Sequence, residues 1–138
     1  ETNKSRIKIN DFEKVLSECS KAFIEETINE KLELRPALIN KFNRVTLVSI
    51  ENQERVTIDL NLEYTIDEKT KSYTNLVVVE LKQERFNRNS AIVKSLHYFG
   101  YNPYSISKYC IGMVTLNKNI KYNAFKQKVR KINKIIAA

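Results

Sequence analysis

Three segments of the chain alternate between polar and apolar residues with a period of two, the pattern of strands that have one wet face. In residues 55–64, one face carries Arg55, Thr57, Asp59, Asn61 and Glu63, and the other carries Val56, Ile58, Leu60, Leu62 and Tyr64. Residues 77–84 place on one face Glu80, Lys82 and Glu84, and residues 38–50 place together Asn40, Phe42, Arg44 and Thr46. These patterns predict an antiparallel sheet that gathers cations and carboxylates on one face.

The turn signals predict how the first two of these strands connect. Residues 38–50 read as a long strand, and the polar residues 51–54 as a short turn. Residues 55–66 then return antiparallel to the first strand. The sequence therefore predicts a β-hairpin in the middle of the chain.

Further strands are expected on both sides of this hairpin. Residues 67–74 are polar and read as a loop, and residues 75–84 are rich in β-branched residues and read as a third strand. A short strand is also expected at residues 5–9, with Arg6 and Lys8 on one face.

Helix caps and apolar stripes predict helices on either side of the strands. The first begins after Asn10 or Asp11 and ends near Glu26. The others cover a segment that follows Asn89 or Ser90 and ends before Gly100, and residues 122–136. Ser105 or Ser107 begins a further segment whose type is ambiguous, and a helix over residues 107–116 is favoured. The order β-α-βββ-ααα indicates an α+β fold, and residues 1–138 are expected to form a single domain.

Charge is distributed very unevenly along the chain. The net charge is +8, yet all 16 acidic residues lie in residues 1–84, and residues 85–138 carry 11 basic residues and no acid. Such asymmetry indicates an anionic partner, which could be nucleic acid, a phosphate polymer or a membrane surface. The alternative is a solvated basic helix without a partner.

Several functional classes are poorly supported by the composition. No apolar run reaches the roughly 20 residues of a membrane helix, so no transmembrane segment is expected. Cys19 and Cys110 have no neighbours at metal-ligand spacing and are expected to be buried, reduced thiols of a cytoplasmic protein. His97 is the only histidine, the glycines are isolated, and no RNA-binding signature is present. Zinc, a protein nucleophile and specific nucleic-acid binding are therefore not expected.

The remaining candidates suit phosphate chemistry. Phosphate binding needs fixed cations, and phosphoryl transfer also needs a divalent metal held by carboxylate oxygens. Glu80 and Lys82 supply one of each on a single strand face. The full candidate set is Arg6, Lys8, Arg44, Arg55, Glu80, Lys82 and Lys108.

Four motifs in this order resemble a known family. They are Phe42-Asn43-Arg44, residues 55–62, Val79-Glu80-Leu81-Lys82 and residues 107–112. Together they resemble the VTC (vacuolar transporter chaperone) domain of bacterial type, within the triphosphate tunnel metalloenzyme (CYTH-like) superfamily. The resemblance spans roughly residues 42–112, and residues 116–132 are similar to the tail of the bacterial members.

The resemblance implies an antiparallel β tunnel, flanked by helices, that makes inorganic polyphosphate from ATP with Mn²⁺ or Mg²⁺. It implies phosphate binding and catalytic roles for Arg44, Arg55 and Lys82. Ser107 and Lys108 would bind phosphate near one mouth of the tunnel, and Lys8 would match a basic position on an earlier strand. Glu80 would hold the metal, with Asp59 and Glu63 in reserve. The alternative role of these two reserve carboxylates is pairing with Arg or Lys across strands.

The resemblance also implies a difference in length. Whole VTC domains are longer at the N-terminus, so this chain is expected to be the C-terminal portion of a tunnel domain, either as a fragment or as a truncated relative. The expected function is therefore polymerase-type phosphoryl transfer that is incomplete in this chain. Two alternatives stay open, namely a non-catalytic polyphosphate-binding module and a triphosphatase of the same superfamily. The sequence leaves the oligomeric state open.

Overall fold

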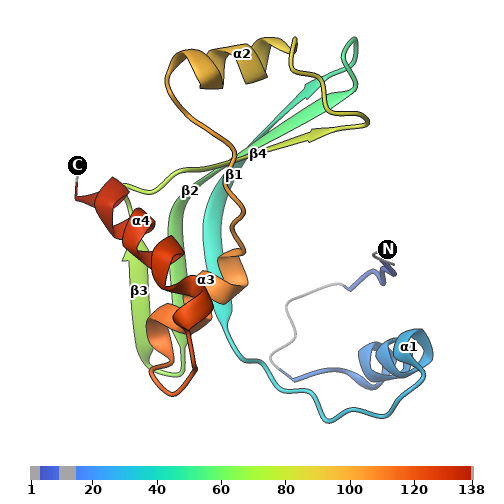
Figure 1. Ribbon diagram of the computed structural model, residues 1–138. Helices are drawn as coiled ribbons and strands as arrows, with labels where there is room; N and C mark the ends of the chain where they lie inside the picture. The colour runs from blue at the N-terminus through green and yellow to red at the C-terminus, as the bar shows by residue number, and fades with distance from the viewer. Residues whose placement is uncertain (1–3, 10–14, 138) are drawn as a thin grey trace. The chain divides into compact units, whose positions relative to one another are not determined.

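A computed structural model describes residues 4–9 and 15–137, and the chain divides into two compact units (Figure 1). The first unit, Glu1–Ala37, contains helix α1 (Glu18–Ile28). Ser17 caps this helix, because its hydroxyl oxygen accepts a hydrogen bond of 3.2 Å from the backbone N–H of Ser20.

Two expectations for the first unit are wrong. The helix begins at Glu18 rather than after Asn10 or Asp11, since the chain is not helical at Val15 and Leu16. Residues 10–14 themselves lie outside the described residues. Residues 5–9, which carry Arg6 and Lys8, form no strand, because none of the strands in the described sheet pairs with them.

The second unit, Leu38–Ala138, is built on one antiparallel sheet. Its strands are β1 (Ile39–Ser49), β2 (Glu54–Ile66), β3 (Lys69–Tyr73) and β4 (Val78–Gln83). The long strand β2 is central, with β1 along one side and β3 followed by β4 along the other (Figure 1). The predicted hairpin and the third predicted strand are confirmed.

Strand β3 corrects the prediction of a polar loop at residues 67–74. The chain reverses at Asp67, whose φ of 52° is the left-handed conformation of a tight turn, so that Lys69 pairs with Ile66. The strand is polar because it is exposed up to Tyr73, and hydrophobic alternation could not reveal it.

A β-bulge in β2 changes which residues share a face. Asn61 has a φ of 53°, and the register between β1 and β2 shifts at this point. Arg44 pairs with Asp59 on one side of the bulge, and Asn40 pairs with Tyr64 on the other. Because Asn40 and Arg44 lie on the same face of β1, their partners Tyr64 and Asp59 also share a face.

The strict period of two is therefore wrong beyond the bulge. Leu62 and Tyr64 lie on the face of Asp59 and are fully buried there. Glu63 lies on the opposite face, where it accepts a hydrogen bond of 3.0 Å from the hydroxyl of Ser72. One sheet face thus changes from charged to apolar along its length.

Helices cover the apolar end of this face. They are α3 (Lys108–Leu116) and α4 (Lys126–Ile136), the second preceded by the short 3₁₀ helix η1 (Asn123–Phe125). Helix α3 packs on β1, β2 and β3. The core that forms there contains Leu62, Tyr64, Tyr73, Leu76, Val78, Ile111 and Ile132.

Helix α2 (Ala91–Tyr98) lies at the other end of the sheet, near the turn between β1 and β2 (Figure 1). Ser90 caps it and donates a hydrogen bond of 2.9 Å to Glu54. Gly100 follows it with a φ of 75°, as the sequence predicts. No helix in the described part of the chain is long and apolar enough to cross a membrane.

The fold class is therefore α+β, with an antiparallel sheet flanked by helices, as expected. The sheet is open within residues 4–9 and 15–137, because β1 forms one edge and β3 with β4 the other. Both cysteines are free, but Cys19 is exposed and Cys110 is half-buried, so the expectation of two buried thiols is wrong.

The buried phenol of Tyr64 leads to a first prediction. Its hydroxyl has no hydrogen-bond partner among the described residues, and burial raises the pKa of Tyr64 to about 12. The unfolded chain ionises this phenol first, so the stability that the neutral phenol contributes is lost as the pH rises from 10 towards 12.

We expect the free energy of unfolding of the wild-type protein to fall by roughly 2 kcal/mol more than that of the Tyr64→Phe variant over this pH interval. Below pH 9 the variant should be as stable as wild type or slightly more stable, since it removes an unsatisfied hydroxyl. Urea unfolding at several pH values measures the difference. Tyr98→Phe is the control, because Tyr98 is 86% exposed. Identical alkaline losses for wild type and Tyr64→Phe would contradict the prediction.

Candidate functional site

The ionic residues predicted from the sheet pattern share one face in the structure. Arg44 on β1 pairs with Asp59 on β2, and Arg55 on β2 pairs with Lys82 on β4. Glu80 lies two residues from Lys82 and therefore on the same face of β4. We call this surface the charged face, defined by Arg44, Arg55, Asp59, Glu80 and Lys82.

Asp59 lies at the end of the charged face farther from the β1–β2 turn. It is fully buried, with 0% of its surface exposed. Arg44 donates two hydrogen bonds to it, from Nε to Oδ1 at 2.6 Å and from Nη2 to Oδ2 at 2.8 Å. Lys108 Nζ lies 2.7 Å from Asp59 Oδ2. The hydrogen bonds from Arg44, together with Lys108, hold the pKa of the Asp59 carboxyl below its usual range.

The beginning of helix α3 brings Lys108 to the sheet. Ser107 caps the helix and accepts a hydrogen bond of 3.3 Å from the backbone N–H of Cys110. Lys108 is the first residue of the helix, and its side chain is only 17% exposed. The favoured helix prediction is confirmed with Ser107 as its cap, and the helix places Lys108 beside the charged face.

Phe42 completes this cluster. The guanidinium carbon of Arg44 lies 4.9 Å from the centroid of the Phe42 ring, and Lys108 Nζ lies 5.4 Å from it. A ring at this distance attracts both cations through its quadrupole. Phe42 therefore contributes to the site through its aromatic ring.

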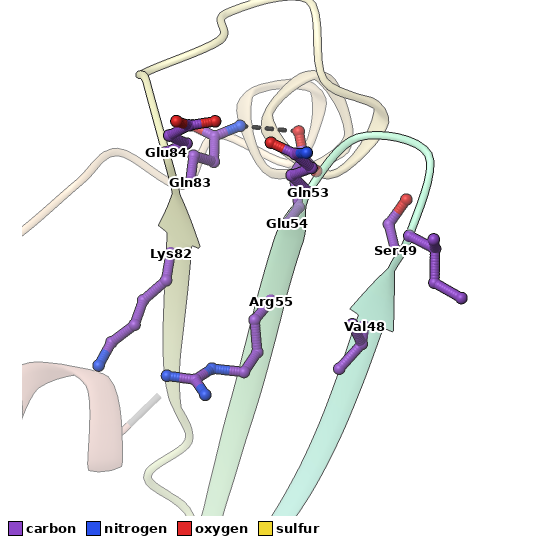
Figure 2. Close-up of a pocket in the computed structure, with 9 residues that line it drawn as sticks. Val48, Ser49, Gln53, Glu54, Arg55, Lys82, Gln83 and Glu84 are labelled. Atoms are coloured by element: carbon purple, nitrogen blue, oxygen red, sulfur yellow. Dashed lines mark hydrogen bonds between the residues drawn. The ribbon is translucent and has the colours of Figure 1, made fainter.

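The end of the charged face near the β1–β2 turn is more open. Glu80 and Lys82 form an ion pair of 3.1 Å, and about half of each side chain is exposed. Arg55 is exposed and makes no ion pair with any residue that the structure describes. Figure 2 shows Arg55 and Lys82 extending in the same direction from β2 and β4, beside a surface hollow that reaches the β1–β2 turn.

The carboxylates of this face differ in their capacity to hold a metal. Within residues 4–9 and 15–137, no group of three or more His, Cys, Asp or Glu side chains could hold a metal ion. Both oxygens of Asp59 are already bound to cations, which argues against its predicted reserve role. Glu63 lies on the other face of the sheet. Glu80, which pairs with Lys82 and is about half exposed, is the other carboxylate of the charged face, and its predicted metal role stays a prediction.

The structure also shows what sequence reasoning missed. Pairing of Asp59 with an Arg across strands, the alternative to a metal role, is confirmed by its contact with Arg44, but the sequence does not predict Lys108 as a second partner. The pairing with Arg44 depends on the strand register, and the contact with Lys108 depends on how a distant helix packs. Lys8 lies in the first unit, and its predicted place beside the tunnel strands stays a prediction.

Comparison with known proteins supports the resemblance on which these roles rest. Residues 2–117 match the family model of the VTC domain, which is most of the chain. No curated protein and no solved structure matches the chain. The chain therefore belongs to the VTC domain family, and this membership indicates a function related to polyphosphate.

Proposed function

We propose that the charged face binds the phosphates of ATP and inorganic polyphosphate in a phosphoryl transfer of the polyphosphate polymerase type. The observation that supports this function is that the charged face carries Arg44, Arg55 and Lys82, and that Lys108 reaches it from α3. The open sheet would be one wall of a triphosphate tunnel whose remaining strands lie outside this sheet. An enclosed basic wall would bind polyanions more strongly than an exposed one, because solvent screens charge less there.

Each side chain has a distinct proposed role. Arg44 and Arg55 carry planar donor groups that match phosphate oxygens, and Lys82 and Lys108 act as point charges. Ser107 can still donate its hydroxyl proton, because it accepts from Cys110 as a helix cap. Together they would neutralise and align the transferring phosphoryl group with the end of the acceptor chain. No protein nucleophile is needed for such a transfer.

Glu80 is the proposed ligand of Mg²⁺ or Mn²⁺. Its carboxylate is about half exposed and adjoins Lys82, so water and phosphate oxygens could complete the metal shell. The metal would neutralise charge on the phosphate oxygens during transfer. We expect weak metal binding in the absence of a phosphate ligand, since a single carboxylate cannot fill the shell.

The open sheet favours a second candidate function. A face that is exposed along its edges could bind polyphosphate without the enclosed geometry that turnover requires. Incubation with ATP, Mn²⁺ and a short polyphosphate primer separates the possibilities. Polymer growth would support the polymerase, and release of free phosphate would support a triphosphatase. Binding without either product would support the binding module.

Two arginines provide the sharpest binding prediction. Arg55 lies on the charged face, and Arg130 lies on the exposed side of α4 within the basic C-terminal part of the chain. A charge-assisted hydrogen bond is worth roughly 1.5–3 kcal/mol, whereas an exposed helix charge contributes much less. We therefore expect Arg55→Ala to weaken polyphosphate binding about tenfold or more, and Arg130→Ala to change it less than about threefold.

Isothermal titration calorimetry at a fixed salt concentration measures both variants. The two substitutions remove the same charge, so the long-range electrostatic effect is matched between them. Equal losses of affinity would indicate diffuse attraction by the basic surface and would argue against a site on the charged face.

A further inference from the structure

The contacts of Asp59 leave its two cations partly free. Arg44 has five N–H donors, of which Asp59 accepts two, and the ammonium of Lys108 has three, of which Asp59 accepts one. Asp59 has 0% of its surface exposed, whereas the side chain of Arg44 is 41% exposed. The carboxylate thus uses only part of the donors of each cation. Arg44 is the more accessible of the two to a ligand, since the Lys108 side chain is 17% exposed.

The cluster of Arg44, Asp59 and Lys108 also offsets the repulsion between its two cations. Arg44 and Lys108 carry like charges, and both lie within 2.8 Å of the same carboxylate. In addition, Lys108 begins α3, where the positive end of the helix dipole disfavours a cation. Without a shared anion, the two side chains would separate into water. Asp59 holds together three elements, since Arg44 comes from β1, Asp59 from β2 and Lys108 from α3.

We propose that Asp59 is a positioning residue that holds Arg44 and Lys108 as a preorganised pair for one phosphate group. The proposal rests on the proposed phosphate-binding function and adds a residue that does not itself touch the ligand. It makes a distinctive claim, namely that a buried negative charge strengthens the binding of an anion. The gain comes from fixing two flexible cations before the ligand arrives.

This claim predicts the opposite sign from simple electrostatics. Asp59→Asn removes one negative charge from a basic face, and Coulomb attraction alone would then make anion binding tighter. If positioning dominates, the same substitution releases Lys108 and weakens the fork of Arg44. We expect Asp59→Asn to bind inorganic triphosphate about tenfold more weakly than wild type does.

The test is calorimetric titration of the full chain with inorganic triphosphate at fixed ionic strength. Glu68→Gln is the matched control, because Glu68 is an exposed residue of the β2–β3 turn and its substitution changes the net charge equally. Its affinity should equal that of wild type or exceed it slightly. An Asp59→Asn affinity equal to or tighter than wild type would overturn the proposal.

A second measurement needs neither ligand nor a variant. In ¹⁵N-labelled wild-type protein, the Nε–H of Arg44 and the ammonium of Lys108 should give separate signals that exchange slowly with water. Lys21 is the comparison, since its ion pair with Glu18 is solvent-exposed and should give an averaged signal. Averaged signals for Arg44 and Lys108 would overturn the proposal. If triphosphate did not bind wild type, the proposed function would fail, and these spectra would still decide whether Asp59 fixes the pair.

Discussion

Asp59→Ala is expected to lower the free energy of unfolding by about 2–3 kcal/mol at neutral pH. Removing one partner from a buried ion pair leaves the other charges without compensation, which typically costs 3–5 kcal/mol. The expected loss is smaller here because the side chain of Arg44 is 41% exposed and water can solvate it. Lys108, which is 17% exposed, bears most of the cost.

The same cluster should give the protein a marked acid sensitivity. The pKa of Asp59 is lower in the folded chain than in the unfolded chain, because Arg44 and Lys108 favour the carboxylate. Its contribution is therefore fully present above the ordinary carboxyl pKa of about 4, and it is lost as the pH falls through the lower folded value. The difference in stability between wild type and Asp59→Ala should shrink over that acidic interval.

Urea unfolding of both proteins between pH 7 and pH 2 measures this difference. Asp67→Asn is the control, because Asp67 is an exposed turn residue whose left-handed conformation asparagine also tolerates. A constant difference between wild type and Asp59→Ala down to pH 2 would contradict an ionised, paired Asp59. If Asp67→Asn lowered the free energy of unfolding as much as Asp59→Ala does, the loss of stability would not be specific to the cluster of Arg44, Asp59 and Lys108.

Local signals in the sequence predicted much of the second unit. Each of the two helix starts has two candidate caps in the sequence, and the structure selects Ser90 and Ser107; it also confirms Gly100 as a helix end. The alternation in β2 and β4 also placed Arg55 and Lys82 on one face, because strand geometry makes this unavoidable over short distances. Caps and short strands depend on neighbouring residues and can therefore be read locally.

The errors arise where distant residues decide the structure. The bulge at Asn61 reverses the faces of the residues that follow. The presence of an asparagine does not by itself predict the left-handed conformation that Asn61 adopts there. Strand β3 is polar, and it forms because its backbone pairs with that of β2. The link between Asp59 and Lys108 joins β2 to a helix 49 positions later, and no local pattern encodes that contact.

The bulge matters for function as well as for the fold. By moving Leu62 and Tyr64 onto the face of Asp59, it gives one continuous surface an apolar end and a charged end. Helix α3 packs on the apolar end, and its first residue, Lys108, reaches the charged end. The position of Lys108 therefore depends on how closely α3 approaches the sheet.

Gly112 determines that approach, and its substitution is expected to be strongly destabilising. A Cβ atom at this position would lie 2.5 Å from Cδ1 and 2.9 Å from Cγ of Tyr64, and 2.7 Å from Cδ2 of Leu38. Leu38 could rotate, but the Tyr64 ring is fully buried and packs edge-to-face on Tyr73 at 5.9 Å between centroids. The helix must therefore move away from the sheet.

Overpacking of this kind costs typically 1–3 kcal/mol, and an alanine in a helix regains about 1 kcal/mol relative to glycine. We expect Gly112→Ala to lower the free energy of unfolding by about 2 kcal/mol, because the clash involves a rigid ring. Gly112→Val should lower the free energy of unfolding by more than about 3 kcal/mol, since it adds more volume and a β-branched side chain. Lys94→Ala, at an exposed position of α2, is the control and should change stability by less than about 0.5 kcal/mol.

Denaturant unfolding measures the stability of these variants, and triphosphate titration of the folded protein measures the coupling to the site. A displaced α3 should carry Lys108 away from Asp59. Gly112→Ala should therefore also weaken triphosphate binding, even though Gly112 itself lies against Tyr64 in the core and not on the charged face. A variant as stable as wild type would show that the helix and the ring adjust without cost. A destabilised variant with unchanged triphosphate affinity would show that the position of Lys108 does not depend on how closely α3 packs on the sheet.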